Sequence, residues 1–547
     1  MDEKISRSRV KGFLKIDGRR TVNEDGEEVL LAGVGLGNWL LPEGYMWKFG
    51  GPHSDRPHRI ERFIRTLAGS KYSEKFWREF RDSYVTRRDL ELIAEAGFNS
   101  IRIPFNHSIL LDDEPGINFR EDGFALIDRV LAWCEELRLY VVLDLHGAPG
   151  GQTGSNIDDC FDDLPRLFID PESRERALAL WTEIARRYKD RWIVAAYDLL
   201  NEPLRTDLPH VPNTEYLHPE LTRFYDDCIA AIRRVDTRHA VSLEGANWAT
   251  RADTFYKRFD PLQIIHFHRY GNLPGEEAFA EWLALGEKFD CPLWLGESGE
   301  NSREWYGAMY PQALAHGIGY NFWPWKRMSG NPVPLEIQQP AGWEKVTAFC
   351  KGGPRPTYAE SQEIFDAYLE NIKAENCVHD ATVAGSILRH GSVRLMATDF
   401  DTGAGACSGC GTGSAEQKPT LLRYRGASGM DIKPRAGMVY SHGPGFQCGW
   451  EKLCLGLAQG EWAVWTFGGA GAKFKARVEG DAAACGVVLR VTETATAKSR
   501  DIALAAGEFA AEAEFAFEAP LPLDEAKLRV EIIEGAADLY AISIDCG

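Results

Sequence analysis

The chain has 547 residues, of which 44% are hydrophobic and 26% charged, a composition typical of a globular protein rather than a disordered or fibrous one. Lys and Arg total 62 against 81 Asp and Glu, so the net charge of −19 argues against nucleic acid or an anionic membrane as a main partner. No run of 18 apolar residues occurs, so we expect no membrane-spanning helix. The charged N-terminus lacks a secretory signal, which predicts a cytoplasmic protein, or a secreted one whose signal has been removed.

The first 375 residues alternate short apolar runs with longer amphipathic stretches. The apolar runs, rich in β-branched residues or bounded by Gly and Pro, predict eight buried strands at 30–36, 100–104, 140–145, 195–200, 240–244, 264–268, 293–296 and 319–323. Helical patterns between them include 86–96, 124–137, 174–188 and 220–235. Buried strands that alternate with helices indicate parallel βα units. Eight of them predict an α/β fold, a (β/α)8 TIM barrel over residues 1–375, with an open doubly wound sheet as the alternative. A further helix at 357–372 is expected to close the barrel.

Residues 376–547 have a different texture, rich in Gly, Ala and Val with short alternating runs. Runs at 462–467, 474–478, 486–491, 528–533 and 539–544 predict the strands of an all-β sandwich, jelly-roll-like in character. The sequence therefore divides into a barrel of about 375 residues and a smaller β-domain.

Polar and ionisable residues follow the predicted barrel strands where each strand ends. In a barrel these ends form the active face, so the side chains converge on one pocket. Two carboxylates stand out, Glu202 and Glu297, each directly after an apolar strand. Glycoside hydrolysis needs such a pair, one carboxyl protonated and one ionised. For either Glu alone, a helix cap or an ion pair with Arg is an equally good explanation.

Several motifs, taken in chain order, resemble glycoside hydrolase family 5 over about residues 28–375. Trp294-Leu-Gly-Glu297-Ser, Asn201-Glu202-Pro203 and His268-Arg-Tyr270 resemble the family as a whole. The runs GVGLGNW at 33–39, FNSIRIP at 98–104 and LDLHGAPG at 143–150 are similar to its exo-β-1,3-glucanase-like branch.

The resemblance implies a retaining double displacement. By motif match, Glu202 is the general acid/base and Glu297 the nucleophile. Asn201 is expected to hold the sugar 2-hydroxyl, Tyr270 to orient the nucleophile and His268 to orient the acid/base side.

The same resemblance extends to the walls of the pocket. Arg102 is expected to keep Glu297 ionised, since a nearby cation lowers a carboxyl pKa. His146 is expected to contact the sugar in the −1 subsite, and Trp323 to form its floor, with Trp325 as the rival because two Trp alternate after the last strand. Glu43 stands at the spacing after a strand-one Trp where the branch binds a terminal sugar, although a solvated loop acid is the alternative.

Two further residues are set aside. Glu300 is a rival nucleophile but lies a turn past the strand end. His266 is assigned to the other face of its strand and is expected to be a core histidine. No HExxH, P-loop or GxGxxG context occurs, so we expect no metal and no cofactor.

The C-terminal domain is similar, more faintly, to the family-6 and family-35 carbohydrate-binding modules. The similarity rests on Gly449-Trp450, on the run GEWAVWTF at 460–467 and on the run DLYAISI at 538–544. It implies that Trp450 is the aromatic residue that binds a ligand. A purely structural role for the domain is the alternative.

The sequence thus predicts a retaining β-glycoside hydrolase, an exo-acting β-glucosidase or exo-β-glucanase, whose partner is a β-linked carbohydrate or glycoside. The alternatives are an endo-β-glucanase, a β-glucosidase for a lipid or other aglycone, and a catalytically silent sugar-binding protein. No pattern in the sequence predicts the oligomeric state.

Overall fold

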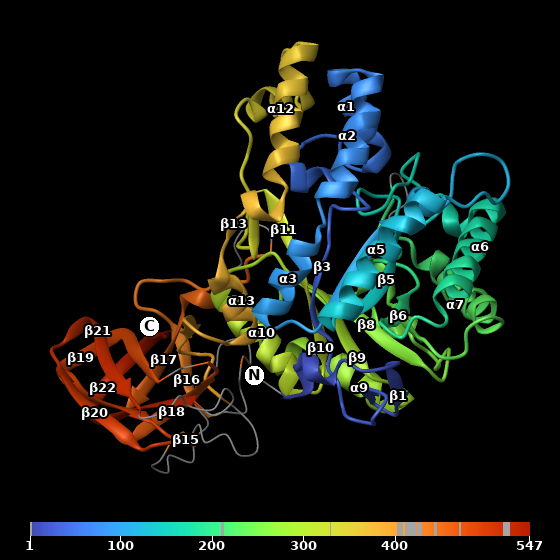
Figure 1. The fold of residues 1–547 in the computed structure, drawn as a ribbon. Helices are drawn as coiled ribbons and strands as arrows, with labels where there is room; N and C mark the ends of the chain where they lie inside the picture. The colour runs from blue at the N-terminus through green and yellow to red at the C-terminus, as the bar shows by residue number, and fades with distance from the viewer. Residues whose placement is uncertain are drawn as a thin grey trace.

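Eight parallel strands close into a barrel in the computed structural model, which describes residues 3–208, 213–328, 330–401, 409–410, 424, 429–441, 446–469, 472–517 and 526–546 (Figure 1). In the order in which they pair around the barrel, with β10 closing onto β3, the strands are β3 (Ala32–Gly35), β4 (Ser100–Asn106), β5 (Tyr140–Gly147), β6 (Val194–Asp198), β7 (Ala240–Glu244), β8 (Gln263–Arg269), β9 (Leu293–Gly299) and β10 (Gly319–Trp323). The predicted TIM barrel is confirmed over the doubly wound alternative. Nearly every residue of these strands is buried. This explains why the strands appear in the sequence as continuous apolar runs and not as alternating apolar and polar residues.

Helices connect successive strands and form the outer layer of the barrel. They include α3 (Arg87–Ala96), α5 (Glu121–Leu137), α6 (Pro171–Tyr188), α7 (His218–Arg233), α9 (Ala280–Phe289) and α10 (Arg303–Ala315). The start of α6 shows how the sequence fixes such an element. The Asp170 side chain accepts hydrogen bonds from the backbone N–H groups of Glu172 and Ser173, and Pro171 occupies the first helical position.

Three helices stand away from the barrel at the top of Figure 1. The helices α1 (Pro57–Ala68) and α2 (Ser70–Ser83) follow β3 and pack against α12 (Tyr358–Asn371). The expectation that the helix at 357–372 closes the barrel is therefore wrong. Its apolar face meets aromatic rings instead, with Phe365 centred 5.5 Å from Phe76 and Tyr368 centred 4.7 Å from Trp47.

The C-terminal domain is antiparallel β-structure, as predicted. Its strands are β14 (Val393–Met396), β15 (Gly409–Cys410), β16 (Asp431–Pro434), β17 (Leu453–Ala458), β18 (Glu461–Phe467), β19 (Lys473–Glu493), β20 (Lys498–Leu504), β21 (Gly507–Ala516) and β22 (Ala526–Asp545). Four of the predicted strands merge into two, because β19 and β22 run side by side through register shifts instead of ending. One shift lies next to Gly486 and Gly535, whose φ angles of +77° and +81° favour glycine.

The two domains meet around α10. The helix α13 (Ala381–Leu388), which the sequence did not predict, packs against α10, as does β14. The Arg389 side chain donates to the Gly307 carbonyl at 2.6 Å, and Arg394 pairs with Glu304 at 2.9 Å. Just past the boundary expected at 375/376, β13 (Val378–His379) pairs with β12 (Leu335–Ile337), which in turn pairs with β11 (Lys326–Met328). The C-terminal domain is thus docked on the barrel. Within the described ranges, no helix is long and apolar enough to cross a membrane.

Candidate active site

A cavity of about 560 Å³ opens at the carboxyl ends of the barrel strands. Most of the residues predicted for the site line it: Glu43, His146, Glu202, His268, Tyr270, Glu297 and Trp323. Arg102 and Asn201 lie directly behind these residues and are hydrogen-bonded to them. The structure therefore brings the predicted residues together, with the exception of Trp325.

Glu297, at the end of β9, has a hydrogen-bond donor on each carboxyl oxygen. The Tyr270 hydroxyl donates to Oε1 at 2.5 Å, and the Arg102 guanidinium donates to Oε2 at 2.6 Å. Burial alone would raise the pKa of Glu297, but the charges of His268 and Arg102 outweigh it and lower the pKa below its usual value. Glu297 is therefore held as a carboxylate.

Glu202 follows β6 in a backbone conformation that non-glycine residues seldom adopt, with φ of +42°. Its backbone N–H donates to Glu244 Oε2 at 2.7 Å, and its carboxyl Oε1 lies 2.8 Å from Nδ1 of His268. Burial raises the pKa of Glu202 above its ordinary value, and the bond to His268 only partly offsets this. Glu202 is therefore suited to carry a proton.

The two carboxyls are close enough to act on one bond. An oxygen of Glu202 and an oxygen of Glu297 lie within 4.8 Å of each other and of a ring nitrogen of His268. The pKa of Glu202 is raised and that of Glu297 is lowered. Such a difference in pKa distinguishes the acid from the base in a pair of carboxyls.

Arg102 lies at the centre of the charge network below the cavity and is fully buried. Its guanidinium nitrogens lie 2.9 to 3.1 Å from carboxylate oxygens of Asp144, Asp198 and Glu244, in addition to the bond to Glu297. It also donates to the Asn201 side-chain oxygen at 2.7 Å, and the Asn201 amide nitrogen lies 3.2 Å from Nε2 of His146. Burial would lower the pKa of Arg102, but the surrounding carboxylates raise it well above the usual value. One permanent cation thus stabilises several buried anions.

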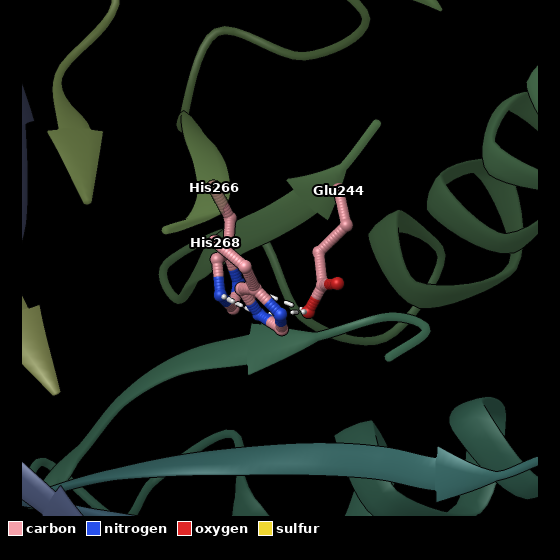
Figure 2. A group of neighbouring side chains, drawn as sticks. All are labelled: Glu244, His266 and His268. Atoms are coloured by element: carbon pink, nitrogen blue, oxygen red, sulfur yellow. Dashed lines mark hydrogen bonds and ion pairs between the residues drawn. The ribbon is translucent and has the colours of Figure 1, made fainter. Parts of the chain in front are cut away.

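Glu244 was not predicted, and His266 was predicted to be a core histidine. Figure 2 shows both of them with His268; Glu244 ends β7, and the two histidines lie on β8. His266 is fully buried, and its Nε2 lies 3.0 Å from Nε2 of His268 while its Nδ1 lies 3.1 Å from Asp198. His266 therefore connects the network to His268. Glu244 carries the same signal as Glu202, a carboxylate at the end of an apolar strand.

Two groups here have the donor atoms that a metal ion could use, Glu244 with His266 and His268, and Glu202 with His268 and Glu297. The shared ligand, His268, already has Nδ1 against Glu202 and Nε2 against His266. The Glu244 oxygens accept from Arg102 and from the Glu202 backbone. A metal would have to replace these bonds, so the geometry favours a hydrogen-bonded network.

Trp323 lies against His146, with ring centres 5.4 Å apart and planes at 7°. Its indole N–H donates to the Tyr45 hydroxyl at 2.9 Å. The glycines after the first barrel strand make room for it, because a Cβ on Gly35 or Gly37 would lie 2.6 or 2.7 Å from the Trp323 ring. The Gly-rich segment at 33–37 is thus explained by close packing, and Trp323 takes the position expected of a floor.

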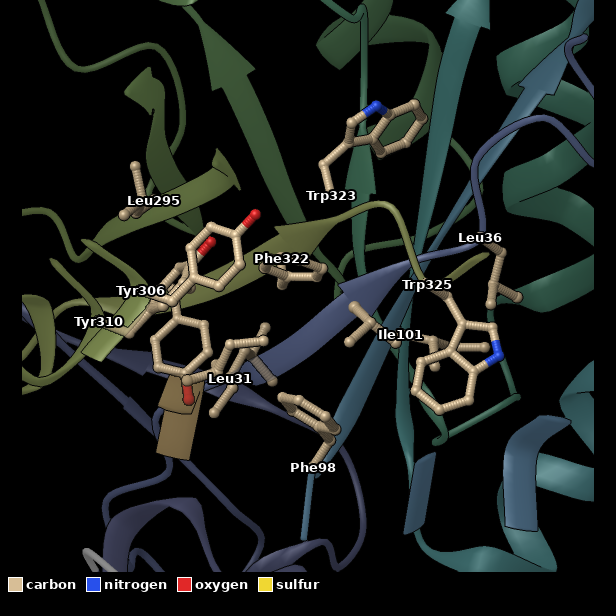
Figure 3. Close-up of a cluster of buried hydrophobic side chains, with 14 of the residues drawn as sticks. Leu31, Leu36, Phe98, Ile101, Leu295, Tyr306, Tyr310, Phe322, Trp323 and Trp325 are labelled. Carbon is tan, nitrogen blue, oxygen red and sulfur yellow. The ribbon is translucent and has the colours of Figure 1, made fainter. Parts of the chain in front are cut away.

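Trp325, the rival for that floor, lies elsewhere. Its side chain extends from the end of β10 in a different direction from Trp323 and packs near Leu36 and Ile101 (Figure 3). Its indole N–H donates to Asp89 at 3.1 Å, and the residue is 1% exposed. The chain leaves the barrel after Trp323, so the alternation of the two Trp does not put both on one face.

The remaining acids near the cavity differ in their partners. Glu43 is buried and lines the cavity, and burial, followed by the charge of Glu297, raises its pKa well above the ordinary value. Glu300 also lines the cavity but forms an ion pair with Arg327. Glu43 is therefore not a solvated loop acid, and the charge of Glu300 is balanced by Arg327.

The residues of the cavity wall that were not predicted include Asn156, Ile157, Trp248 and Phe446. The first three lie on the loops after β5 and β7, and Phe446 belongs to the C-terminal domain. No periodic pattern marks any of them. The proposed ligand aromatic of that domain, Trp450, is fully buried and does not present a binding face.

Residues 65–329 match the family model described as Cellulase (glycosyl hydrolase family 5). "Beta-xylosidase" of Phanerodontia chrysosporium is 33% identical over 301 residues, 54% of this chain and 59% of that protein. "Endoglucanase C" of Acetivibrio thermocellus is 34% identical over 214 residues, 38% of this chain and 56% of that protein. "Probable glucan 1,3-beta-glucosidase A" of Aspergillus clavatus is 25% identical over 268 residues, 48% of this chain and 61% of that protein.

A closed parallel barrel with two unlike carboxyls at its mouth defines the class of protein, a glycosidase-type barrel. The barrel of this chain resembles glycosyl hydrolase family 5, whose model matches residues 65–329. The chain spans about 56 to 61% of the length of these curated relatives.

Proposed function

We propose that the protein is a retaining β-glycoside hydrolase that removes a single sugar from the non-reducing end of its substrate. The observation that carries the proposal is the pair Glu202 and Glu297. Their oxygens lie within 4.8 Å, one pKa is raised and the other lowered. A short separation of the two carboxyls favours a covalent intermediate over direct attack by water, which needs a gap of about 6.5 Å or more.

In the first displacement, a Glu297 oxygen attacks the anomeric carbon and forms a glycosyl ester. The bond from that carbon to the glycosidic oxygen breaks, and the oxygen takes the proton of Glu202 as the aglycone leaves. Tyr270 and Arg102 hold the attacking carboxylate in place through their bonds to its two oxygens. We assign the sugar 2-hydroxyl to Asn201, whose amide oxygen accepts from Arg102 and whose amide nitrogen lies 3.2 Å from Nε2 of His146.

In the second displacement, Glu202, now ionised, takes a proton from water while the water oxygen attacks the anomeric carbon. The ester bond breaks and Glu297 returns as a carboxylate. Two inversions give net retention, and both carboxyls end in their starting protonation states.

Removal of a terminal sugar is supported by the polar wall of the cavity. Glu43, Tyr45 and Glu300 line the cavity together with Trp323. Because its pKa is raised, Glu43 can offer both a donor and an acceptor to sugar hydroxyls. The names of the relatives differ in sugar, xylose in one and glucan in others, so the assay must include both sugars.

The test is hydrolysis of aryl β-glucoside, β-xyloside and β-galactoside by the wild type and by Glu202→Ala and Glu297→Ala. We expect turnover of at least one substrate, loss in both variants and a β-configured first product by NMR. An α-configured first product would exclude the covalent intermediate, and full activity of Glu297→Ala would refute the site.

Products from a ladder of β-glucan oligosaccharides separate exo from endo action. An exo enzyme releases monosaccharide from the start, whereas an endoglucanase, the runner-up, gives mixed oligosaccharides. A silent sugar-binding protein would show binding in calorimetry without turnover of any substrate.

A further inference from the structure

One side chain of the C-terminal domain reaches the cavity. Phe446 lies between β16 and β17, lines the same cavity as Glu202 and Glu297, and is 45% exposed. A phenyl ring with nearly half of its surface open, at the mouth of a cavity, offers an apolar face to whatever enters.

Phe446 is held on the barrel by specific contacts. Its ring stacks on Tyr270, with centres 4.8 Å apart and planes at 25°. Its carbonyl accepts a hydrogen bond from the Asn301 side chain at 2.9 Å, and the same amide lies 3.4 Å from the Tyr270 carbonyl. The ring is thus fixed beside the tyrosine that bonds Glu297.

A second aromatic residue is held at the cavity by an unusual backbone. Asn247, Trp248 and Ala249 have consecutive φ angles of +54°, +57° and +58°. Non-glycine residues seldom adopt this region, and such backbone strain gathers at binding and catalytic sites. The Trp248 backbone N–H donates to the Leu204 carbonyl at 3.2 Å, which ties this segment to the loop that carries Glu202.

The position of Trp248 relative to Glu202, the proposed acid, indicates which part of the substrate Trp248 faces. The proton of Glu202 goes to the oxygen of the leaving group, so the loops beside Glu202 surround the aglycone rather than the retained sugar. Trp248 is tied to the loop of Glu202 through Leu204, and Ile157 and Phe446 add apolar side chains to the same cavity.

We propose that Phe446, with Trp248 and Ile157, forms a leaving-group subsite that selects β-glycosides with an apolar aglycone. The C-terminal domain is then part of the active site through one aromatic residue. This inference rests on the proposed function for its orientation, because it assumes that Glu202 protonates the leaving group.

The experiment compares octyl and methyl β-D-glucoside, below the micelle concentration of the former, in the full-length protein. Both release an alcohol and share the sugar, so the ratio of their kcat/KM values reports the aglycone alone. We expect the wild type to prefer the octyl substrate, and Phe446→Ala and Trp248→Ala each to reduce the ratio roughly tenfold. A partly misfolded preparation lowers both rates equally and leaves the ratio unchanged.

The matched control is Val439→Ala, which removes an apolar side chain from the same segment. Val439 is 78% exposed and is not among the residues that line the cavity. We expect its ratio to equal that of the wild type. An unchanged ratio in both Phe446→Ala and Trp248→Ala would overturn the subsite.

Binding separates this inference from the proposed function. Octyl and methyl 1-thio-β-D-glucoside resist hydrolysis, so calorimetry measures their affinities whether or not the protein is a hydrolase. Tighter binding of the octyl compound by the wild type, reduced in Phe446→Ala, supports the subsite even if no glycoside is turned over. Absence of an octyl preference in the wild type overturns the subsite even if hydrolysis is found.

Discussion

The two carboxyls of the cavity differ in the charges around them and hardly at all in burial. Glu297 is 5% exposed and Glu202 is 8% exposed. Arg102 and Tyr270 reach the oxygens of Glu297, whereas the carboxyl of Glu202 has a histidine nitrogen and, among the residues that the structure describes, no arginine. The comparison teaches that partner charge, acting on equally desolvated groups, sets one carboxyl up as a base and the other as an acid.

The largest expected loss of activity follows from removing the carboxyl of Glu297, which lies beside Arg102. Glu297→Ala should lower kcat for an aryl β-glycoside by about 10⁵-fold, because no other group can form the ester. Glu300→Ala is the matched control, since it removes a second carboxyl from the same cavity wall. Steady-state assays should show less than about a hundredfold loss there. Equal losses in the two variants would mean that the nucleophile is misassigned.

The next effect concerns one hydrogen bond to Glu297. Tyr270→Phe should lower kcat/KM by about 10- to 100-fold, the usual cost of removing a bond to a charged group. The bond holds the pKa of Glu297 down, so its loss raises that pKa and moves the acidic limb of the pH–rate profile to higher pH. The basic limb, set by Glu202, should stay in place. Movement of the basic limb alone would reverse the two assignments.

A smaller loss with a different pH signature is expected at His268, which faces both carboxyls. His268→Asn should lower kcat about tenfold. The imidazolium lowers the pKa of Glu202 and of Glu297, so its removal raises both. Both limbs of the profile should therefore move to higher pH, unlike the single limb of Tyr270→Phe. A profile that matches the wild type would show that His268 carries no charge.

The smallest effect on activity is expected at Trp325, which separates core from site. Trp325→Phe should leave kcat/KM within about twofold while the free energy of unfolding falls by about 1 kcal/mol, because the bond to Asp89 is lost. Trp323→Phe is the comparison and should raise KM. Urea unfolding and steady-state kinetics measure the two quantities. A raised KM in Trp325→Phe would return that residue to the floor.

The site residues at strand ends could be predicted because all parallel strands of a barrel end at the same face. Parallel strands deliver Glu202 and Glu297 to one face, and each lies directly after its apolar run. Trp325 could be mistaken for the floor of the sugar site because it follows the point where the chain leaves β10. Phe446 could not be predicted at all, since its place depends on how the C-terminal domain docks, and no local pattern encodes docking.

The same limit explains the helix at 357–372. Its helical pattern could be predicted from the sequence, but its packing partners could not. Phe76 and Trp47 lie in segments to which no strand or helix was assigned. His266 was placed correctly in the interior, but the assignment of the other parity was wrong. Residues two apart in a strand share a side, and Nε2 of His266 lies 3.0 Å from Nε2 of His268.

The pairing of β22 has a consequence for the order of assembly. This strand pairs with β14, β17, β18 and β19, so the C-terminal domain has no complete sheet until residue 545 has left the ribosome. The barrel strands are synthesised long before, and domains fold as they emerge. Glu202 and Glu297 can therefore be brought together early, while the docking of Phe446 on the barrel waits until β22 has paired between β17 and β18.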